Sequence, residues 1–405
     1  MRIKPFKALR PPQEIARLVA SVPYDTVDTG EARALAEGNP KSFLRIDRPE
    51  INLPGNLEEY TDEVFAAAEN EFKEFREKRF LIQEPEPSHY IYRIETENHA
   101  QHGLVTCCHI EDYENNVIKR HETTRKIKEI ERTRHMETLN AHPSPVFITY
   151  KDSARIDEIT EKTELQQPLI DFTDSNNIRH TIWKTPDPRE IIDMFRLVPF
   201  CYIADGHHRG AAAYNFGTKK RKTNPAHTGE EEYNWFLSIL FPATQLRILP
   251  YNRCVKDLNG MDENEFIKKV KQYFKINATG SHRPSKAGAI CMYIGSQWYE
   301  LNWAPTAAPD QISSLDVSVL QSRLLAPILG IEDPRKDTRI EFIGGNRGTD
   351  ELVKLVDTGQ AAVAFSMHPV SVFQMMAIAD ACQIMPPKST WFDPKPLSGL
   401  FVHCV

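Results

Sequence analysis

The stretch that decides the fold of this sequence is FCYIADGHHRGAAAY, residues 200–214. Its first part is an apolar run typical of a buried strand, and its last part is rich in alanine, which favours a helix. The two parts meet at Asp205 and Gly206, where a tight turn would expose the free N–H groups of the first helical turn. The stretch therefore predicts a strand, a turn and a helix whose N-terminus is an anion site.

Each polar residue of this turn has a role that fits a bound phosphate. Gly206 would let a phosphate approach the backbone without a Cβ in the way, and His207, His208 and Arg209 would add donors and charge. Asp205 could hold a metal such as Mg²⁺ or orient a histidine; the less favoured alternative is a simple helix N-cap. Zinc chelation by His207 and His208 is improbable, because neighbours on a helix point about 100° apart.

A second basic segment, KRHETTR (residues 119–125), precedes a charged helix expected at about residues 124–140. Four of its basic side chains fall at steps of three and four and would form one row on the helix: Arg125, Lys128, Arg132 and His135. Such a row suits a triphosphate, although a solvated face neutralised by Glu129, Glu131 and Glu137 is an equal alternative. The residues that precede the helix would add phosphate contacts: Lys119, Arg120 and His121.

Three further segments are candidates for the site. Tyr24 and Asp25 follow an expected strand end, so Asp25 could be a base or metal ligand and Tyr24 could contact substrate, whereas a turn-capping role is equally compatible. FIGGNRG (residues 342–348) resembles a phosphate loop but fits neither common motif, so a plain turn is the better interpretation. Lys388 and Ser389 could enter a cleft or simply anchor the C-terminus.

Outward from these motifs, the pattern predicts an α+β (mixed α/β) fold in three parts, residues 1–83, 84–216 and 233–405, joined by a polar loop at residues 217–232. Apolar spacing predicts helices at about residues 29–37, 57–80, 156–165, 189–195, 317–329 and 350–356. Strands are predicted at about residues 42–46, 90–94, 104–110, 145–150, 179–183 and 235–240. Those at residues 235–240, 289–294 and 298–301 are assigned to a second mixed-sheet layer.

Composition excludes several classes of protein. The 405 residues are 40% hydrophobic and 26% charged, and 50 Lys and Arg against 56 Asp and Glu give a net charge of −6, which argues against nucleic-acid binding through bulk charge. Seven cysteines without C-x-x-C spacing indicate reduced thiols. With no apolar leader or membrane-spanning stretch visible, we expect a cytoplasmic protein without a membrane partner.

Five ordered strings resemble one family along nearly the whole chain, the prokaryotic domain-of-unknown-function family 1015. They are SVPYDTV (21–27), ALAEGNPKSFLRIDRPE (34–50), VIKRHETT (117–124), IADGHHRGAAAY (203–214) and MPPKSTWFDPKPLSGLF (385–401). The strand, DGHHR turn and helix also resemble the phosphate-binding signature of the ParB/sulfiredoxin superfamily, and SerK-type free serine kinases carry the same DGHHR string. This second resemblance implies a ParB/sulfiredoxin-like nucleotide-binding core, elaborated here by large insertions.

The resemblance implies a kinase that uses ATP or ADP, with Mg²⁺, to phosphorylate free L-serine to O-phosphoserine, holding the nucleotide phosphates at Gly206, His207, His208 and Arg209. The acceptor hydroxyl needs a group to orient it and take its proton; Glu122 and Asp25 are the candidates, with His207 beside them. The alternatives are a ParB-like regulator that binds nucleotide without catalysis, and a metallohydrolase using His207 and His208. The sequence leaves room for a homodimer.

Overall fold

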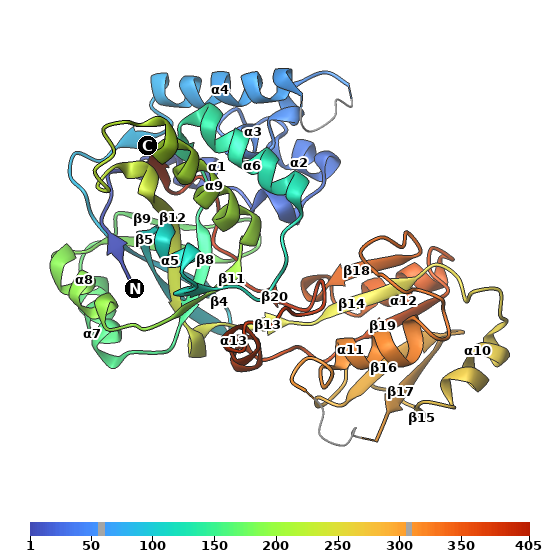
Figure 1. The fold of residues 1–405 in the computed structure, drawn as a ribbon. Helices are drawn as coiled ribbons and strands as arrows, with labels where there is room; N and C mark the ends of the chain where they lie inside the picture. Colours follow the sequence, from blue (N-terminus) through green and yellow to red (C-terminus); the bar gives the residue numbers. More distant parts are fainter. Residues whose placement is uncertain (56–60, 305–309) are drawn as a thin grey trace. The chain divides into compact units, whose positions relative to one another are not determined.

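The chain folds into two compact units, and each is described separately. The computed structural model describes residues 1–55, 61–304 and 310–405. One unit combines Met1–Leu246 with Pro394–Val405, and the other is Arg247–Asp393. Both units contain helices and strands in mixed order, so the α+β class is confirmed (Figure 1).

The large sheet of the first unit has the order β6-β11-β8-β12-β5-β4-β10-β9, with β1 beside β5. Within it β6 and β8 run parallel to β11 and β12 respectively, and the other pairs are antiparallel. Its strands are β1 (Ile3–Lys4), β4 (Tyr90–Thr96), β5 (His99–His109), β6 (Ile118–Lys119), β8 (Val146–Tyr150), β9 (Ile170–Thr173), β10 (Arg179–Lys184), β11 (Cys201–Asp205) and β12 (Trp235–Pro242). The β6–β11 pair forms one edge and carries the two motifs of interest.

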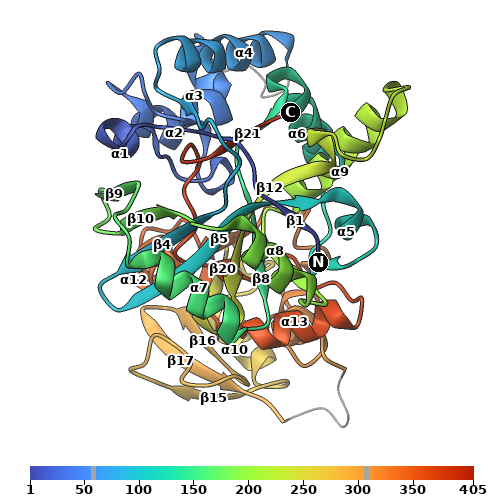
Figure 2. The ribbon, with the colours of Figure 1, turned by 90° about the vertical axis from the view of Figure 1, so that its left-hand side faces the viewer.

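Helices of the first unit pack against this sheet or against one another. They are α1 (Ala16–Val19), α2 (Thr29–Ala36), α3 (Leu44–Asp47), α4 (Asp62–Glu77), α5 (Ile110–Glu114), α6 (Lys126–Leu139), α7 (Ala154–Glu164), α8 (Pro188–Arg196) and α9 (His207–Thr223). Apolar side chains of β5, β8, β11 and β12 pack against α7, α8 and α9 in one core. Helix α6 lies beside α9 and α4 packs on α6, an arrangement visible in both ribbon views (Figures 1 and 2).

A small sheet pairs the C-terminal strand with strands from the N-terminal part of the first unit. Its order is β3-β2-β21-β7, from β2 (Ala8–Arg10), β3 (Ile82–Gln83), β7 (Ala141–His142) and β21 (Val402–Cys404). This pairing places the last twelve residues with the first unit, so the chain divides differently from the three sequential parts expected. Strand β12 likewise belongs to the large sheet rather than to a second layer, because it pairs with β5 and β8.

Two segments differ from the elements expected. The predicted strand at residues 42–46 is instead helix α3, because Phe43 and Ile46, three residues apart, are both buried on one side of a helical turn. The polar loop expected from residue 217 begins only after Thr223, because α9 continues through Lys and Arg residues that favour a helix. Gly217 within that extension is buried against the backbone of Tyr233.

The second unit is built on a six-stranded sheet of order β15-β17-β16-β19-β14-β18. Its strands are β14 (Tyr251–Val255), β15 (Lys275–Ala278), β16 (Ala289–Ile294), β17 (Gln297–Asn302), β18 (Ile340–Gly344) and β19 (Val363–Ser366), with a separate pair β13 (Ile248–Leu249) and β20 (Trp391–Phe392). Its helices are α10 (Glu263–Val270), α11 (Asp316–Leu320), α12 (Asp350–Asp357) and α13 (Val372–Asp380). The helix expected at residues 317–329 is α11 followed by a π-helical turn, Gln321–Leu325.

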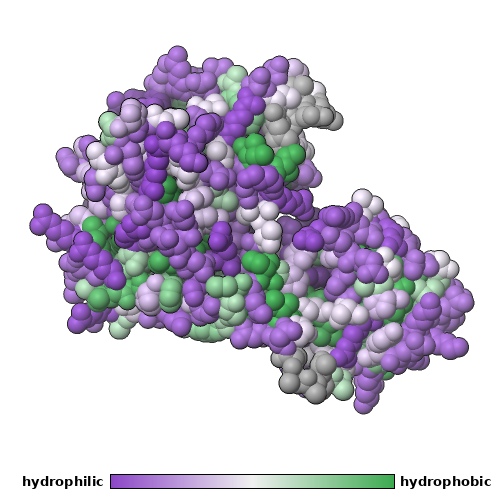
Figure 3. Space-filling view, viewed as in Figure 1, coloured by the Kyte–Doolittle hydropathy of each residue, from purple (hydrophilic) through white to green (hydrophobic). Residues whose placement is uncertain are grey.

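The surface in view is mainly hydrophilic, with separate hydrophobic patches (Figure 3). Ile127 and Ile130 of α6, and Leu165 after α7, are among the exposed large apolar side chains. All seven cysteines are free thiols. None of the helices in the described part of the chain is long and apolar enough to cross a membrane.

Candidate active site

The DGHHR turn has the strand–turn–helix geometry predicted. Strand β11 ends at Asp205, Gly206 adopts a left-handed conformation with φ of 87°, and α9 begins at His207. No side chain caps this 17-residue helix. Its N-terminus therefore keeps the partial positive charge and the free N–H groups of a long helix.

Asp205 is not the N-cap of α9, and its carboxylate forms ion pairs with two cationic side chains. Its Oδ1 accepts a hydrogen bond from Lys395 Nζ at 2.7 Å, and its Oδ2 accepts one from Arg209 Nη2 at 2.8 Å. Burial alone would raise the pKa of Asp205, but Lys395 and Arg209 outweigh it and hold that pKa well below its usual value. The carboxylate fixes the turn by joining α9 to the C-terminal segment.

Arg209, expected to add a donor and charge to a bound phosphate, points into the protein. It is only 5% exposed, and Nη1 donates to the carbonyl of Pro145 while Nη2 binds Asp205. The guanidinium lies so close beneath Gly206 that a Cβ there would meet Arg209 Nε at 2.8 Å. The Arg209 side chain therefore packs directly against the turn and supports its conformation.

Three imidazoles gather around the start of α9. The rings of His121 and His207 meet edge to face at 4.5 Å, and His208 Nε2 accepts a hydrogen bond from the backbone N–H of Arg125 at 3.0 Å. Burial lowers the pKa of His121 and of His207 to about 3, and it also lowers the pKa of His208. Near pH 7 these groups are neutral imidazoles, so they can orient a ligand without adding charge.

Two half-exposed carboxylates flank the same helix start. The side chain of Glu122 is 40% exposed and lies 3.7 Å from His207 Nδ1, whereas that of Asp25 is 37% exposed and lies 3.8 Å from Arg209 Nη2. Both carboxylates also act on His208, whose pKa they raise against the larger effect of burial. The two residues nominated as bases thus each lie near a residue of the same turn, at 3.7 and 3.8 Å.

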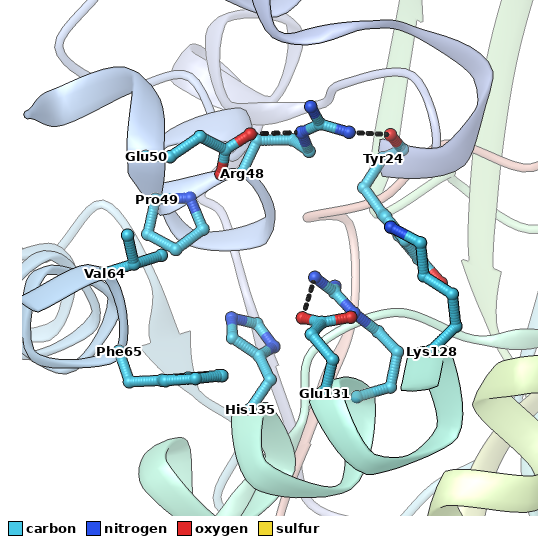
Figure 4. A pocket seen from close by; sticks show the side chains of 10 residues that line it. Tyr24, Arg48, Pro49, Glu50, Val64, Phe65, Lys128, Glu131 and His135 are labelled. Atoms are coloured by element: carbon cyan, nitrogen blue, oxygen red, sulfur yellow. Dashed lines mark hydrogen bonds and ion pairs between the residues drawn. The ribbon is translucent and has the colours of Figure 1, made fainter. Parts of the chain in front are cut away.

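The basic row of α6 lines a pocket next to this turn (Figure 4). Lys128, Arg132 and His135 face it together with Tyr24 and Arg48, in a space of about 320 Å³ that includes its open mouth. The shared face predicted from three- and four-residue spacing is therefore observed for these three residues.

Most charges in this pocket are already paired. Arg132 binds Glu131 at 2.5 Å, and its guanidinium stacks on the Tyr24 ring at 3.9 Å. Arg48 binds Glu50 at 2.6 Å. Burial lowers the pKa of His135 to about 4, and its Nε2 contacts the carbonyl of Ile46 at 2.9 Å. The basic row was expected either to bind a triphosphate or to be neutralised by neighbouring glutamates. For Arg132 the structure shows neutralisation, by Glu131.

The other residues of the KRHETTR segment lie around the turn rather than in the pocket. Lys119 is buried with Nζ 4.0 Å from the centre of the Phe200 ring. Arg120 is exposed and stacks on the Tyr113 ring at 4.8 Å. Arg125 is the exposed N-cap of α6. Arg125 is therefore the member of this segment whose backbone reaches the turn directly, through His208.

Lys388 and Ser389 lie in the second unit. Lys388 Nζ lies 5.4 Å from the centre of the Tyr251 ring, and Ser389 Oγ donates to the carbonyl of Pro386 at 2.6 Å. The glycine-rich segment starts within β18 and continues as the short 3-10 turn Gly345–Arg347, in agreement with a plain turn.

The chemistry of Asp205 does not fit a metal ligand, because both of its oxygens already accept from cations. Among the residues that the structure describes, no group of three or more His, Cys, Asp or Glu side chains could hold a metal ion. His207 and His208 accordingly lack the further ligands that a metallohydrolase would need.

Sequence reasoning missed Lys395, Arg48 and Asp47. Lys395 is 190 residues from Asp205 and stands in the string MPPKSTWFDPKPLSGLF, which resembled the family but gave Lys395 no role. Arg48 and Asp47 stand in the string FLRIDRPE, which carried the family resemblance without any assigned role. That string was the available signal for them.

Comparison with known proteins gives a family but no close relative of known activity. No curated protein matches this chain. Among solved structures it is similar to SbnI with a C-terminal truncation from Staphylococcus aureus, at 13% identity and a TM-score of 0.40, over 74% of this chain and 87% of that one. It is also similar to a free serine kinase in complex with AMP (12% identity, TM-score 0.36, 71% and 86%) and to a conserved hypothetical protein from Pyrococcus furiosus (13%, 0.36, 74% and 95%).

The family model described as "Protein of unknown function (DUF1015)" matches residues 3–318, which is more than half of the chain. The strings quoted from the sequence resemble the same family, and four of the five lie inside the matched range. The chain belongs to the DUF1015 family.

Proposed function

We propose that this protein is a nucleotide-dependent kinase that phosphorylates the hydroxyl group of a small molecule, with free L-serine as the acceptor and a ParB/sulfiredoxin-like core in its first unit. The observation that carries the proposal is the uncapped start of α9 with two half-exposed carboxylates, Asp25 and Glu122, near its first residues. Phosphoryl transfer needs little more from a protein than positioning, charge neutralisation and a group to accept the hydroxyl proton.

The start of α9 supplies the anion site. A phosphate above Gly206 would accept from the free N–H groups of the first helical turn, and the absence of a Cβ at Gly206 allows that approach. Arg209 and Lys395 add positive charge from below, and His208 is a neutral donor or acceptor at the rim. The nucleotide would be ATP or ADP, bound through its phosphates.

The flanking carboxylates supply the proton acceptor. The acceptor oxygen would attack the terminal phosphorus, forming a new P–O bond while the bond to the leaving nucleotide oxygen breaks. The hydroxyl proton would pass to the carboxylate of Asp25 or Glu122. His207, at 3.7 Å from Glu122, would orient that carboxylate.

Mg²⁺, where the nucleotide brings it, would be held mainly by phosphate oxygens with one carboxylate, as is usual for this ion. Asp25 and Glu122 are partly exposed carboxylates near the turn, whereas Asp205 is occupied by Lys395 and Arg209. Bound there, the ion would neutralise charge on the phosphates.

The variants Asp25→Asn and Glu122→Gln test this proposal. One of them should reduce transfer from ATP or ADP to L-serine by at least about 100-fold, the effect typical of losing a general base, with nucleotide affinity retained. Glu114→Gln, at an exposed position at the end of α5, is the matched control and should leave transfer unchanged.

The opposite result has a clear meaning. If the wild-type protein binds nucleotide tightly but produces neither phosphoserine nor nucleotide turnover, the kinase proposal fails and a ParB-like nucleotide switch replaces it. If neither variant affects transfer, the base is elsewhere and the assigned role of the two carboxylates is wrong.

A further inference from the structure

Residues 394–398 form an irregular segment that carries Lys395 to the end of β11. Lys395 Nζ lies 2.7 Å from Asp205 Oδ1, and the Lys395 side chain is only 11% exposed. A segment without the hydrogen bonds of a helix or an extended sheet needs other contacts to stay in place. The contacts that fix this segment therefore decide where the Lys395 charge lies.

The charge of Lys395 matters because Arg209 faces two carboxylates. Arg209 Nη2 lies 2.8 Å from Asp205 Oδ2 and 3.8 Å from Asp25 Oδ2. Two negative charges against one positive charge would repel a phosphate from the start of α9. Lys395 supplies the second positive charge, so that these four groups balance. Anion binding at the turn thus depends on a residue of segment 394–398.

Tyr92, on β4, anchors the segment through its hydroxyl group. The backbone N–H of Leu397 donates to Tyr92 Oη at 3.5 Å, and Tyr92 Oη lies 2.7 Å from His180 Nδ1. His180 Nε2 in turn lies 3.4 Å from Asp174 Oδ2. With the His180 proton on Nε2, each bond of this chain has one donor and one acceptor. The chain therefore fixes the direction of the Tyr92 hydroxyl.

Two further contacts hold the ends of the segment. Gln101 Nε2 donates to the carbonyl of Pro394 at 3.0 Å, one residue before Lys395. Ser398 exchanges backbone hydrogen bonds with Ser21, at 2.8 and 3.0 Å. Gln101 and Ser398 are each only 1% exposed, so water competes little for these bonds. Lys395 therefore lies between fixed points on both sides.

Strand register places the anchors on the same face of the large sheet as Asp205. Directly paired residues of neighbouring strands share a face. Such pairs run from Asp205 on β11 through β8, β12 and β5 to Tyr90, two residues before Tyr92 on β4. Segment 394–398 contacts this face at both places. Contacts on β4 and β5 can therefore fix a charge at β11.

From these contacts we propose that Tyr92 and Gln101 are positioning residues of the nucleotide site, which fix segment 394–398 so that the Lys395 charge stays beside Asp205. This rests on the proposed function for the nature of the anion, a nucleotide phosphate, but requires no transfer. Neither residue touches the anion in this assignment, and both act through Lys395. Residues of β4 and β5, several strands away from β11, thereby take part in anion binding.

Calorimetric titration of full-length variants with ADP tests the role of the charge. Lys395→Met should weaken ADP binding about 10- to 100-fold, the loss expected for an interaction with a charged group. Lys395→Arg keeps a cation and should recover part of that affinity, although the two side chains differ in shape.

Two tyrosine variants then test the anchor. Tyr92→Phe removes only the hydroxyl and should weaken ADP binding about 2- to 10-fold, the effect of one neutral hydrogen bond. Tyr90→Phe is the matched control, because Tyr90 is a buried residue of the same strand whose hydroxyl forms no hydrogen bond to segment 394–398. It should leave ADP affinity unchanged.

The double variant Tyr92→Phe/Lys395→Met separates positioning from general destabilisation. If Tyr92 acts through Lys395, removal of the hydroxyl costs no further ADP affinity once the charge is gone, although it still lowers the free energy of unfolding. Gln101→Met, which removes the other anchor, should show the same pattern with and without Lys395. The result then does not depend on the folding of one variant.

Three results would overturn the proposal: wild-type ADP affinity in both Tyr92→Phe and Gln101→Met, an equal loss from Tyr92→Phe with and without Lys395, or wild-type protein that binds no ADP. Transfer to L-serine, measured on the same samples, keeps the two proposals apart. The expected affinity pattern without transfer contradicts the kinase alone. Transfer by variants that bind ADP as tightly as the wild type contradicts the positioning role alone.

Discussion

Arg209 shows how a residue within a phosphate-binding motif can act mainly on its own protein. Its guanidinium is buried and binds Asp205 and the Pro145 carbonyl. Arg209→Ala should therefore lower the free energy of unfolding by about 3 kcal/mol, because removing one partner of a buried ion pair leaves the other charge poorly compensated. It should weaken nucleotide binding as well, since the turn loses its support.

Denaturant unfolding of Arg209→Ala checks this, with Arg196→Ala as the control. Arg196 forms an exposed pair with Asp193 on α8, so its loss should cost less than about 1 kcal/mol. Equal midpoints for Arg209→Ala and the wild type would show that the inward contacts carry no stability.

For single residues, the sequence predicts contacts between neighbours in the chain and misses contacts between segments that are far apart in the sequence. The DGHHR residues could be assigned to one turn because they are consecutive, and the row on α6 could be assigned because helical spacing is periodic. Lys395 and Asp47 reach the site by chain reversals over many residues, and the inward direction of Arg209 depends on Pro145 and Asp205 together. No spacing rule covers such contacts.

The turn between β11 and α9 is the element on which the site depends. Gly206 has φ of 87°, and a Cβ there would lie 2.8 to 3.0 Å from the Arg209 guanidinium. Gly206→Ala should therefore lower the free energy of unfolding by about 1 to 2 kcal/mol, the cost of a left-handed backbone for a residue with a Cβ. It should also displace the Arg209 side chain. Nucleotide affinity should fall at least about tenfold, as expected for the loss of one hydrogen bond to a charged group.

Gly38→Ala isolates the backbone effect. Gly38 also has a positive φ, of 68°, but nothing lies within 4 Å of a Cβ there. Thermal unfolding and nucleotide titration of both variants should show a larger stability loss at Gly206 and unchanged affinity at Gly38. Identical losses at the two positions would contradict the steric role of Arg209.

Strong periodicity predicted the buried face of the helix expected at residues 57–80, which is α4 over Asp62–Glu77 with Val64, Phe65, Ala68, Phe72 and Phe75 buried. Residues 57–60 of that expected helix lie outside the described part of the chain. Short apolar runs were not predicted correctly, because a few residues cannot distinguish a strand from one turn of helix. Residues 42–46 are such a run, and burial of Phe43 and Ile46 on one side decided in favour of α3. The strand order, with β6 parallel to β11, likewise depends on pairing between distant segments.

Across the whole molecule, buried neutral histidines predict sensitivity to acid. Burial lowers the pKa of His89 and His207 to about 3 and of His403 to about 4, well below the value of about 6.5 in an unfolded chain. The unfolded chain then binds more protons, so this stability is fully present above about pH 6.5 and is lost as the pH falls below it. Each group steepens the loss by up to about 1.4 kcal/mol per pH unit.

His89→Leu tests this dependence, since neither ring nitrogen of His89 has a hydrogen-bond partner among the described residues. Denaturant unfolding at several values between pH 5 and pH 7.5 should show a shallower fall for this variant than for the wild type, by up to about 1.4 kcal/mol per pH unit. His282→Gln, at an exposed position, should leave the slope unchanged. Parallel curves for His89→Leu and the wild type would contradict the assignment.

The central claim is that the start of α9 holds a nucleotide whose phosphoryl group passes to an amino acid hydroxyl. Phosphorus NMR of the full-length protein with Mg²⁺, L-serine and ATP or ADP tests it most directly, because donor, leaving nucleotide and product each give a separate signal. The account predicts a new phosphomonoester signal that grows as the donor signal falls, and that is lost when Gly206→Ala protein is used. Donor that stays intact with folded wild-type protein, or donor consumed to inorganic phosphate alone, would contradict it.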